Sequence, residues 1–124
     1  SSAVVILVDT SIWVDHLRTG NQQLTALLEA GRVLAHPFVI GELALGRLNP
    51  RNTILAALAD LPQARVATDR EVLEFIELQA LAGLGVGYVD VHLLAAARLS
   101  EDASLWTSDR RLHAIAGRLA LAAT

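Results

Sequence analysis

The segment VVILVDTS, residues 4–11, determines the fold class that the sequence predicts. Its first five residues are β-branched or Leu with no polar interruption, which is the pattern of a strand buried on both faces. Asp9, Thr10 and Ser11 follow, all residue types that favour helix N-caps, so we expect a short helix over residues 12–17. A buried strand that runs directly into a helix is typical of a parallel α/β sheet.

The same alternation continues along the chain. Further strands are expected at residues 33–35, 64–67, 104–107 and 119–122. Helices are expected at residues 22–30, 37–48, 53–59, 69–82, 89–99 and 109–116. The sequence therefore predicts a three-layer α/β/α domain around a short, mostly parallel central sheet. Because the chain has no Met, we expect residues 1–3 to be a processed or non-native remnant and residues 4–124 to form the single domain.

The composition excludes several kinds of site. There is no Cys, so disulfides, thiolate zinc sites and Cys nucleophiles are absent, and no Lys stands among the 10 basic residues. The net charge of −3 argues against a protein that binds nucleic acid mainly through an excess of positive charge. With 53% apolar residues but no apolar run long enough for a membrane span, we expect a cytoplasmic protein that self-associates or binds a partner.

Four acidic residues fall where an open α/β sheet forms its binding site. Asp9 follows the first strand and Asp109 follows the strand at 104–107, while Asp90 lies in the first turn of a helix and Glu42 lies inside one. Ligands of parallel sheets bind beyond the carboxyl ends of the strands. If the first of these strands and the one at 104–107 are neighbours, Asp9 and Asp109 converge there.

Converging carboxylates raise one another's pKa, so a cluster of them needs a cation. Oxygen ligands without Cys or a chelating His suit Mg²⁺ or Mn²⁺, which most often handle phosphate oxygens. A purely structural interpretation remains open, because each Asp stands near a helix start and could serve only as an N-cap. Glu42 has no such position, although it could simply face solvent.

Four short blocks resemble the PIN-domain ribonucleases of the VapC toxin type. They are VDTSIW at residues 8–13, IGEL at 40–43, GYVDVHLLAAA at 87–97 and TSDRRL at 107–112. The blocks follow the family's order, with the last one in the place of the Thr-x-Asp pattern that follows its fourth strand. The resemblance covers almost the whole chain. One departure is that Arg110, Arg111 and Leu112 stand where a further acid could be.

The resemblance implies a metal-dependent endoribonuclease, the toxin of a toxin–antitoxin pair. In such a family Asp9, Glu42 and Asp90 match the acids that hold one or two Mg²⁺ or Mn²⁺ ions, and Asp109 matches a fourth acid that often acts through water. Cleavage of the RNA phosphodiester would leave a 5′-phosphate and a 3′-hydroxyl. The hydroxyls of Thr10 and Thr107 are possible supports for these ligands. The implied partners are the RNA substrate, a cognate antitoxin protein and a second copy of the chain.

Other residues give weaker indications. Arg47, Arg110 and Arg111 could contact RNA phosphates, although a solvated surface position is the simpler interpretation of each. The glycines of residues 83–87 predict a flexible turn rather than a dinucleotide site, because the third glycine of that motif is missing. The His residues are scattered. The aromatic residues Trp13, Phe38, Phe75 and Trp106 are expected in the core or in an interface.

Two rival functions remain. A non-catalytic PIN-like module that binds RNA or a protein partner is possible, although such a module has no need to keep four repelling carboxylates. A phosphatase of the haloacid dehalogenase type would also place an Asp after the first strand. That chemistry expects a second Asp two residues later, where Ser11 stands, and it commonly uses a Lys that this chain lacks.

Overall fold

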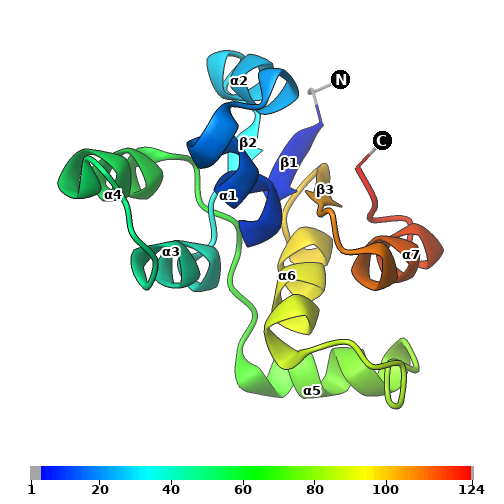
Figure 1. The fold of residues 1–124 in the computed structure, drawn as a ribbon. Helices are drawn as coiled ribbons and strands as arrows, with labels where there is room; N and C mark the ends of the chain where they lie inside the picture. Colours follow the sequence, from blue (N-terminus) through cyan, green and yellow to red (C-terminus); the bar gives the residue numbers. More distant parts are fainter. Residues whose placement is uncertain (1–3, 124) are drawn as a thin grey trace.

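The computed structural model describes residues 4–123, so the expected remnant at residues 1–3 lies outside the described residues, as does residue 124. A small parallel sheet surrounded by helices forms this part of the chain (Figure 1). The strands are β1 (Val5–Val8), β2 (Val33–Leu34) and β3 (Ala103–Trp106). The helices are α1 (Thr10–Thr19), α2 (Gln22–Glu29), α3 (Pro37–Ala44), α4 (Arg51–Asp60), α5 (Asp69–Leu78), α6 (Tyr88–Leu99) and α7 (Arg110–Arg118). This arrangement confirms the expected α/β fold.

The order of the strands in the sheet is β2-β1-β3, and both pairings are parallel. In the register, Leu7 is opposite Leu34 on one side and Leu105 on the other. The expectation that the first strand and the strand near residue 105 are neighbours is therefore confirmed. Because parallel strands end at the same edge, the residues that follow β1 and β3 meet there.

Local sequence explains where the helices begin. Asn21 accepts a hydrogen bond from the Leu24 N–H at the start of α2, and Thr68 forms a reciprocal capping box with Glu71 at the start of α5. The side chain of His36 accepts from the Phe38 N–H before α3, whose first residue is Pro37. These caps fix the register of each helix against the sheet.

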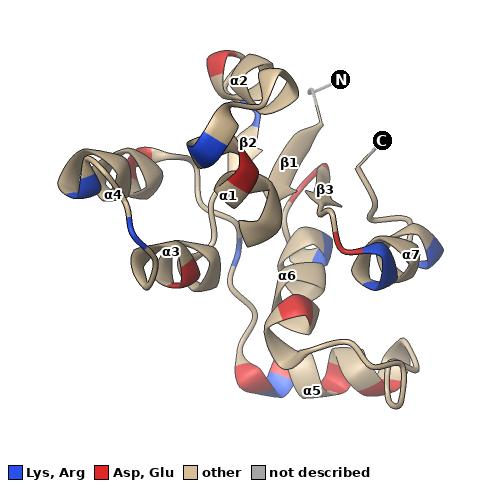
Figure 2. Ribbon diagram, in the orientation of Figure 1, with Lys and Arg blue, Asp and Glu red and all other residues tan. Residues whose placement is uncertain are grey.

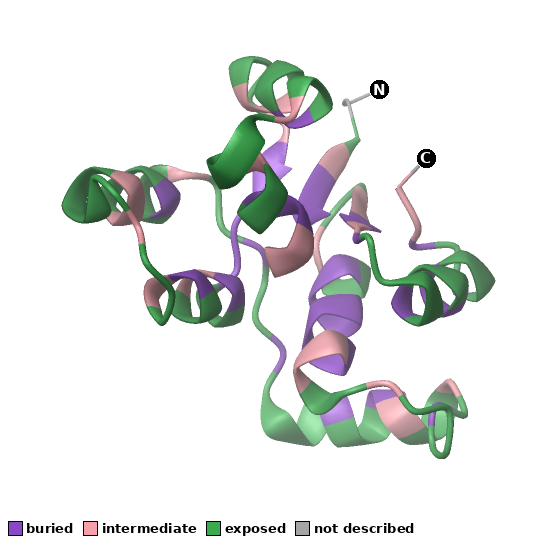
Figure 3. Ribbon diagram, viewed as in Figure 1, coloured by how far each residue is buried: buried purple, intermediate pink, exposed green. Residues whose placement is uncertain are grey.

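Helix α6 is the most deeply buried helix of the fold. All seven residues from 91 to 97 are buried, and Figure 3 shows most of the helix in the colour of buried residues. It packs against β3 on one side and against α5 on the other, while α1 packs on α3 and α3 on α4. Within residues 4–123, no helix combines the length and the apolar character needed to cross a bilayer.

Two expected strands are wrong. Residues 64–67 form no strand. At the single bridge between Ala35 and Gln63 the Ala64 N–H still donates to the Ala35 carbonyl, but the following Arg65 N–H donates to the Ser100 hydroxyl instead. Residues 119–122 likewise make one bridge, between Leu105 and Ala122, since Ala120 has φ +59° and the chain is still turning there. The strand at 104–107 is therefore the third strand of the sheet, not the fourth.

Two helices end earlier than expected. Helix α3 stops at Ala44 rather than near residue 48, and the Arg51 guanidinium donates to the carbonyls of Ala44 and Gly46, at 2.7 and 3.3 Å. Helix α5 stops at Leu78 rather than near residue 82, because Ala80 adopts φ +54°. Both ends depend on backbone conformations and long side chains that apolar periodicity does not report.

Candidate active site

Asp9 lies at the carboxyl end of β1, where the chain turns into α1. Its side chain is buried, with 8% exposed, and accepts three hydrogen bonds. Oδ1 accepts from the Thr10 N–H at 2.8 Å, and Oδ2 accepts from the Ser11 hydroxyl at 3.1 Å and from the Thr107 hydroxyl at 2.7 Å. Asp9 therefore caps α1, as the alternative interpretation of the sequence expected. It also accepts a hydrogen bond from Thr107, which lies 98 positions away in the sequence.

The segment after β3 brings Asp109 to the same edge. The Thr107 hydroxyl that donates to Asp9 also accepts from the Asp109 N–H at 3.0 Å, and the Ser108 N–H donates to Ser11 Oγ at 3.2 Å. Asp109 Oδ1 accepts from the Leu112 N–H at 3.0 Å and caps α7. Asp109 thus caps α7 and also lies close to Asp9, as predicted. The Thr107 hydroxyl links the two residues, because it contacts both of them.

Glu42 reaches the site from α3, which packs against α1. Its Oε1 accepts from the Thr10 hydroxyl at 2.7 Å, although its side chain is otherwise exposed. Thr10 thus donates its backbone N–H to Asp9 and its hydroxyl to Glu42, so it sets the spacing of the two acids. The expectation that Thr10 caps the helix is wrong, because Asp9 is the N-cap and Thr10 the first helical residue, but its hydroxyl does face the acids, as expected.

Asp90 stands in the first turn of α6 and is half-buried. Burial, and then the charges of Asp9, Asp109 and Glu42, together raise the pKa of its carboxyl from 3.8 to about 6, against a lowering by a hydrogen bond from the Gly87 backbone. Gly87 occupies the N-cap position of α6, and the Asp90 carboxyl, three residues later, accepts a hydrogen bond from its backbone. Its perturbed pKa shows that the four predicted acids share one electrostatic environment.

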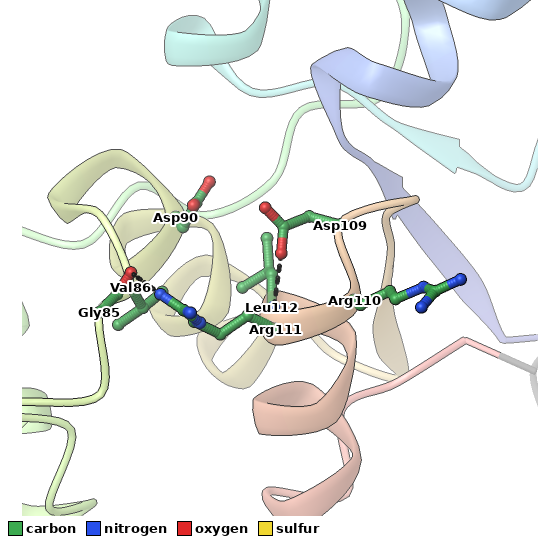
Figure 4. A pocket seen from close by; sticks show the side chains of 7 residues that line it. All are labelled: Gly85, Val86, Asp90, Asp109, Arg110, Arg111 and Leu112. Atoms are coloured by element: carbon green, nitrogen blue, oxygen red, sulfur yellow. Dashed lines mark hydrogen bonds between the residues drawn. The ribbon is translucent and has the colours of Figure 1, made fainter.

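A cavity of about 330 Å³ adjoins these acids. Its lining residues are Gly85, Val86, Asp90, Asp109, Arg110, Arg111 and Leu112. In Figure 4 the carboxyl groups of Asp90 and Asp109 face the same space, between α6 and the start of α7. The cavity therefore adjoins the acidic edge. Figure 2 shows the acidic positions on α3, on α6 and just before α7.

The three arginines that the sequence singled out are placed differently. Arg111 Nη1 donates to the Gly85 carbonyl at 3.2 Å and closes one side of the cavity (Figure 4). The Arg110 guanidinium points away from both acids in that view, and Arg47 is exposed in the turn between α3 and α4. Gly85 has φ +75°, and a Cβ there would collide with Arg111, so the turn requires this glycine.

The donor set suits a hard divalent cation. All four side chains offer carboxylate oxygens, and within residues 4–123 none of them pairs with an Arg or His side chain. In the described chain no three acidic or His side chains already stand close enough to share one ion. Glu42 and Asp109 are exposed, so rotation about their side-chain bonds can still change where their oxygens lie.

Sequence analysis missed two groupings near this site. Ser11 is not the expected helix cap, since Asp9 occupies that position; its hydroxyl instead links Asp9 to the backbone of Ser108. His36 and His92, which appeared scattered, both contact the Phe38 ring, with centroid distances of 5.1 and 4.7 Å. Neither grouping leaves a local pattern in the sequence, since each joins elements far apart along the chain.

Comparison with known proteins agrees with this geometry. The profile of the PIN domain family matches residues 6–118. The chain is 46% identical over 110 residues to Ribonuclease VapC32 of Mycobacterium tuberculosis, in the strains H37Rv and CDC 1551, and the match covers 89% of both chains. The residues matched by the PIN family include Asp9, Glu42, Asp90 and Asp109. The chain therefore belongs to the PIN-domain family, within the VapC type.

Proposed function

We propose that this chain is a metal-dependent endoribonuclease, the toxin of a toxin–antitoxin pair, which hydrolyses RNA phosphodiesters. The observation that carries the proposal is the convergence of four carboxylates at one edge of the sheet, joined by the Thr10 and Thr107 hydroxyls, where burial and the three other charges raise the pKa of Asp90 to about 6. Four carboxylates that repel one another destabilise a fold. A bound cation offsets this repulsion, which makes a cation-binding role the best account of the cluster. The similarity to a protein named Ribonuclease VapC32 supports RNA as the substrate.

Asp9, Glu42 and Asp90 are the residues that would hold Mg²⁺ or Mn²⁺, with Asp109 as a fourth acid acting directly or through water. When bound, such an ion offsets the acids' charge, activates water and stabilises negative charge on the phosphate under attack. The Thr107 and Ser11 hydroxyls hold Asp9 in one orientation, and the Thr10 hydroxyl holds Glu42.

The remaining residues of the site orient the substrate. Asp90 and Asp109 border a cavity of about 330 Å³ that also contains the Arg111 side chain, whose charge favours an RNA phosphate at that position. Arg110 and Arg47 are exposed and are proposed to contact phosphates further along the strand. Because cellular RNA is the substrate, the cytoplasm is the compartment in which we propose that the enzyme acts.

The decisive experiment is cleavage of RNA by the purified, antitoxin-free protein. With Mg²⁺ or Mn²⁺ we expect discrete fragments with 5′-phosphate and 3′-hydroxyl ends, and EDTA should abolish them. Asp90→Asn should reduce cleavage at least about 100-fold, since it removes a carboxylate while the Asn oxygen can still accept from the Gly87 backbone. The matched control is Glu77→Gln, which removes one acid from the exposed surface of α5 and should cleave like the unmodified chain.

Two results would contradict the proposal. Cleavage that persists in EDTA, or an Asp90→Asn variant as active as the control, would show that the four acids take no part in the reaction. A folded protein that binds RNA but never cuts it would favour the alternative, a non-catalytic PIN-like module that binds RNA or a protein partner.

The proposed partners are a cognate antitoxin protein and a second copy of the chain. Several apolar side chains support this, because they are largely exposed: Leu45 at 90%, Leu78 at 81% and Leu73 at 59%. Light scattering on the purified chain should give the mass of a dimer. A monomeric mass across the micromolar range would contradict the dimer and leave the antitoxin to cover this surface.

A further inference from the structure

The exposed aromatic side chains of this chain adjoin its acidic residues. The chain has two Trp, two Phe and one Tyr. Trp13 and Phe75 are buried and Trp106 is half-buried, whereas Phe38 is 36% and Tyr88 is 46% exposed. Phe38 lies one helical turn before Glu42 on α3, and Tyr88 lies two residues before Asp90 at the start of α6. The two exposed rings therefore stand on the same two helices that supply site acids.

Both rings are held in place by the buried His92. The centroid of the His92 ring is 4.7 Å from that of Phe38 and 4.8 Å from that of Tyr88. The Tyr88 hydroxyl donates to Asp69 Oδ1 at 3.1 Å, and the His36 ring packs on Phe38 from below the surface. Both exposed rings thus contact the same buried imidazole. These contacts restrict the orientations of the Phe38 and Tyr88 side chains before any ligand binds.

Gly41 leaves the neighbouring surface of α3 bare. It lies inside the helix, three residues after Phe38 and next to Glu42, and a Cβ added there would meet nothing within 4 Å. A glycine inside a helix is less stable than an alanine, and here neither a positive φ nor a close neighbour requires it. The missing side chain keeps the helix backbone accessible between an aromatic ring and a site acid.

We propose that Phe38, Gly41 and Tyr88 form a stacking platform for one nucleobase of single-stranded RNA, beside the phosphodiester that the acids cut. This inference rests on the function proposed above and identifies what binds next to the site. Every base has a flat π-face that stacks on aromatic rings, and Gly41 lets a base or ribose approach the helix. With a net charge of −3 and no Lys, phosphate contacts alone give little affinity, so stacking supplies part of it.

A protein surface is the competing occupant of this face. Leu45, which is 90% exposed, continues the exposed side of α3 beyond Glu42 and would be covered by a protein partner. The observations favour a base, because the rings flank the acids and Tyr88 belongs to a different helix from Leu45. The test must therefore measure both RNA binding and oligomeric state.

The variants are Phe38→Leu, Tyr88→Leu and Gly41→Ala, each in the full chain. Tyr88→Phe keeps the ring and loses only the hydrogen bond to Asp69. Leu73→Ala removes an apolar side chain of α5 that is 59% exposed, more than either ring. Affinity for fluorescent single-stranded RNA is measured in EDTA, where no cutting occurs. KM and kcat are then measured with Mg²⁺ or Mn²⁺, and molecular mass by light scattering.

We expect the three platform variants to bind RNA about 10- to 100-fold more weakly, the effect of losing one stacked base, with a raised KM and a smaller change in kcat. Gly41→Ala should weaken RNA binding while raising the melting temperature, a combination that a purely structural role does not produce. Leu73→Ala should keep the RNA affinity and KM of the unmodified chain, and Tyr88→Phe, which keeps the ring, should bind RNA more tightly than Tyr88→Leu. An RNA with an abasic site beside the cut should erase the difference between Phe38→Leu and the unmodified chain.

The failures of the two proposals are distinguishable. If the unmodified chain never cuts RNA but binds it, and the platform variants weaken that binding, the nuclease proposal fails and the platform stands. If the chain cuts RNA and the variants keep its affinity and KM, the platform is overturned and the nuclease stands. Variants that change the molecular mass but not RNA affinity assign this face to a protein, and no RNA binding at all overturns both proposals.

Discussion

Asp90→Asn should stabilise this protein at neutral pH while abolishing its activity. The structure places the Asp90 carboxyl, half-buried, among the charges of Asp9, Asp109 and Glu42, and its pKa rises from 3.8 to about 6. Each pKa unit corresponds to about 1.4 kcal/mol, so the ionised carboxylate costs the fold at most about 3 kcal/mol. Because solvent still reaches the side chain, we expect a gain of about 1–2 kcal/mol in the free energy of unfolding.

The effect has a defined pH dependence. A carboxyl whose pKa is raised in the folded state binds its proton more tightly there, so its contribution to stability is complete below pH 3.8 and is lost as the pH rises through about 6. The difference between Asp90→Asn and the unmodified chain should therefore be small at pH 4 and reach about 1–2 kcal/mol at pH 7.5. Titrations shared by both proteins cancel in this difference.

Urea unfolding followed by circular dichroism at pH 4, 5, 6 and 7.5, in EDTA, measures the difference. Glu77→Gln is the control for losing one negative charge and should shift the free energy of unfolding by less than about 0.5 kcal/mol. Adding Mg²⁺ at pH 7.5 should stabilise the unmodified chain and leave Asp90→Asn almost unchanged, since a ligand stabilises only the state that binds it. An Asp90→Asn variant that is less stable than the unmodified chain at pH 7.5, or a difference independent of pH, would refute the reasoning.

Three further predictions concern the support of the site. Thr107→Val removes the donor at 2.7 Å from Asp9 and should cost about 1–3 kcal/mol in urea unfolding, whereas Thr107→Ser keeps the hydroxyl and should cost much less. Burial, and then the charge of His92, lower the pKa of His36 to about 4. The free energy of unfolding should therefore fall as the pH drops from 6.5 towards 4. His36→Asn keeps an N-cap acceptor and should remove that pH dependence. Gly85→Ala forces φ +75° on an L-residue and displaces Arg111, which should cost about 1–2 kcal/mol and raise KM for RNA; an unchanged melting temperature would contradict this.

The local elements of the fold were largely predictable because their signals are local. The buried run of β1, the Asn21 and Thr68 caps and Pro37 at the first position of α3 each act within a few residues. The wrongly predicted strand at residues 64–67 failed because its backbone partner lies far away in the sequence. Its apolar character is real, since Ala64 and Ala67 are buried, but its backbone donor at Arg65 finds Ser100 rather than a neighbouring strand.

The candidate site divides in the same way. The sequence alone determined which acids are available and that Asp9 and Asp109 follow strands, because N-cap chemistry and strand ends are read over a few residues. Only the tertiary structure decided that β1 lies between β2 and β3, and that Thr107 bonds to Asp9 across 98 positions of sequence. The same is true of Phe38 and Tyr88, whose rings meet through His92 and remain exposed. Strand order and burial are set by packing among distant elements, and for that physical reason no local pattern contains them.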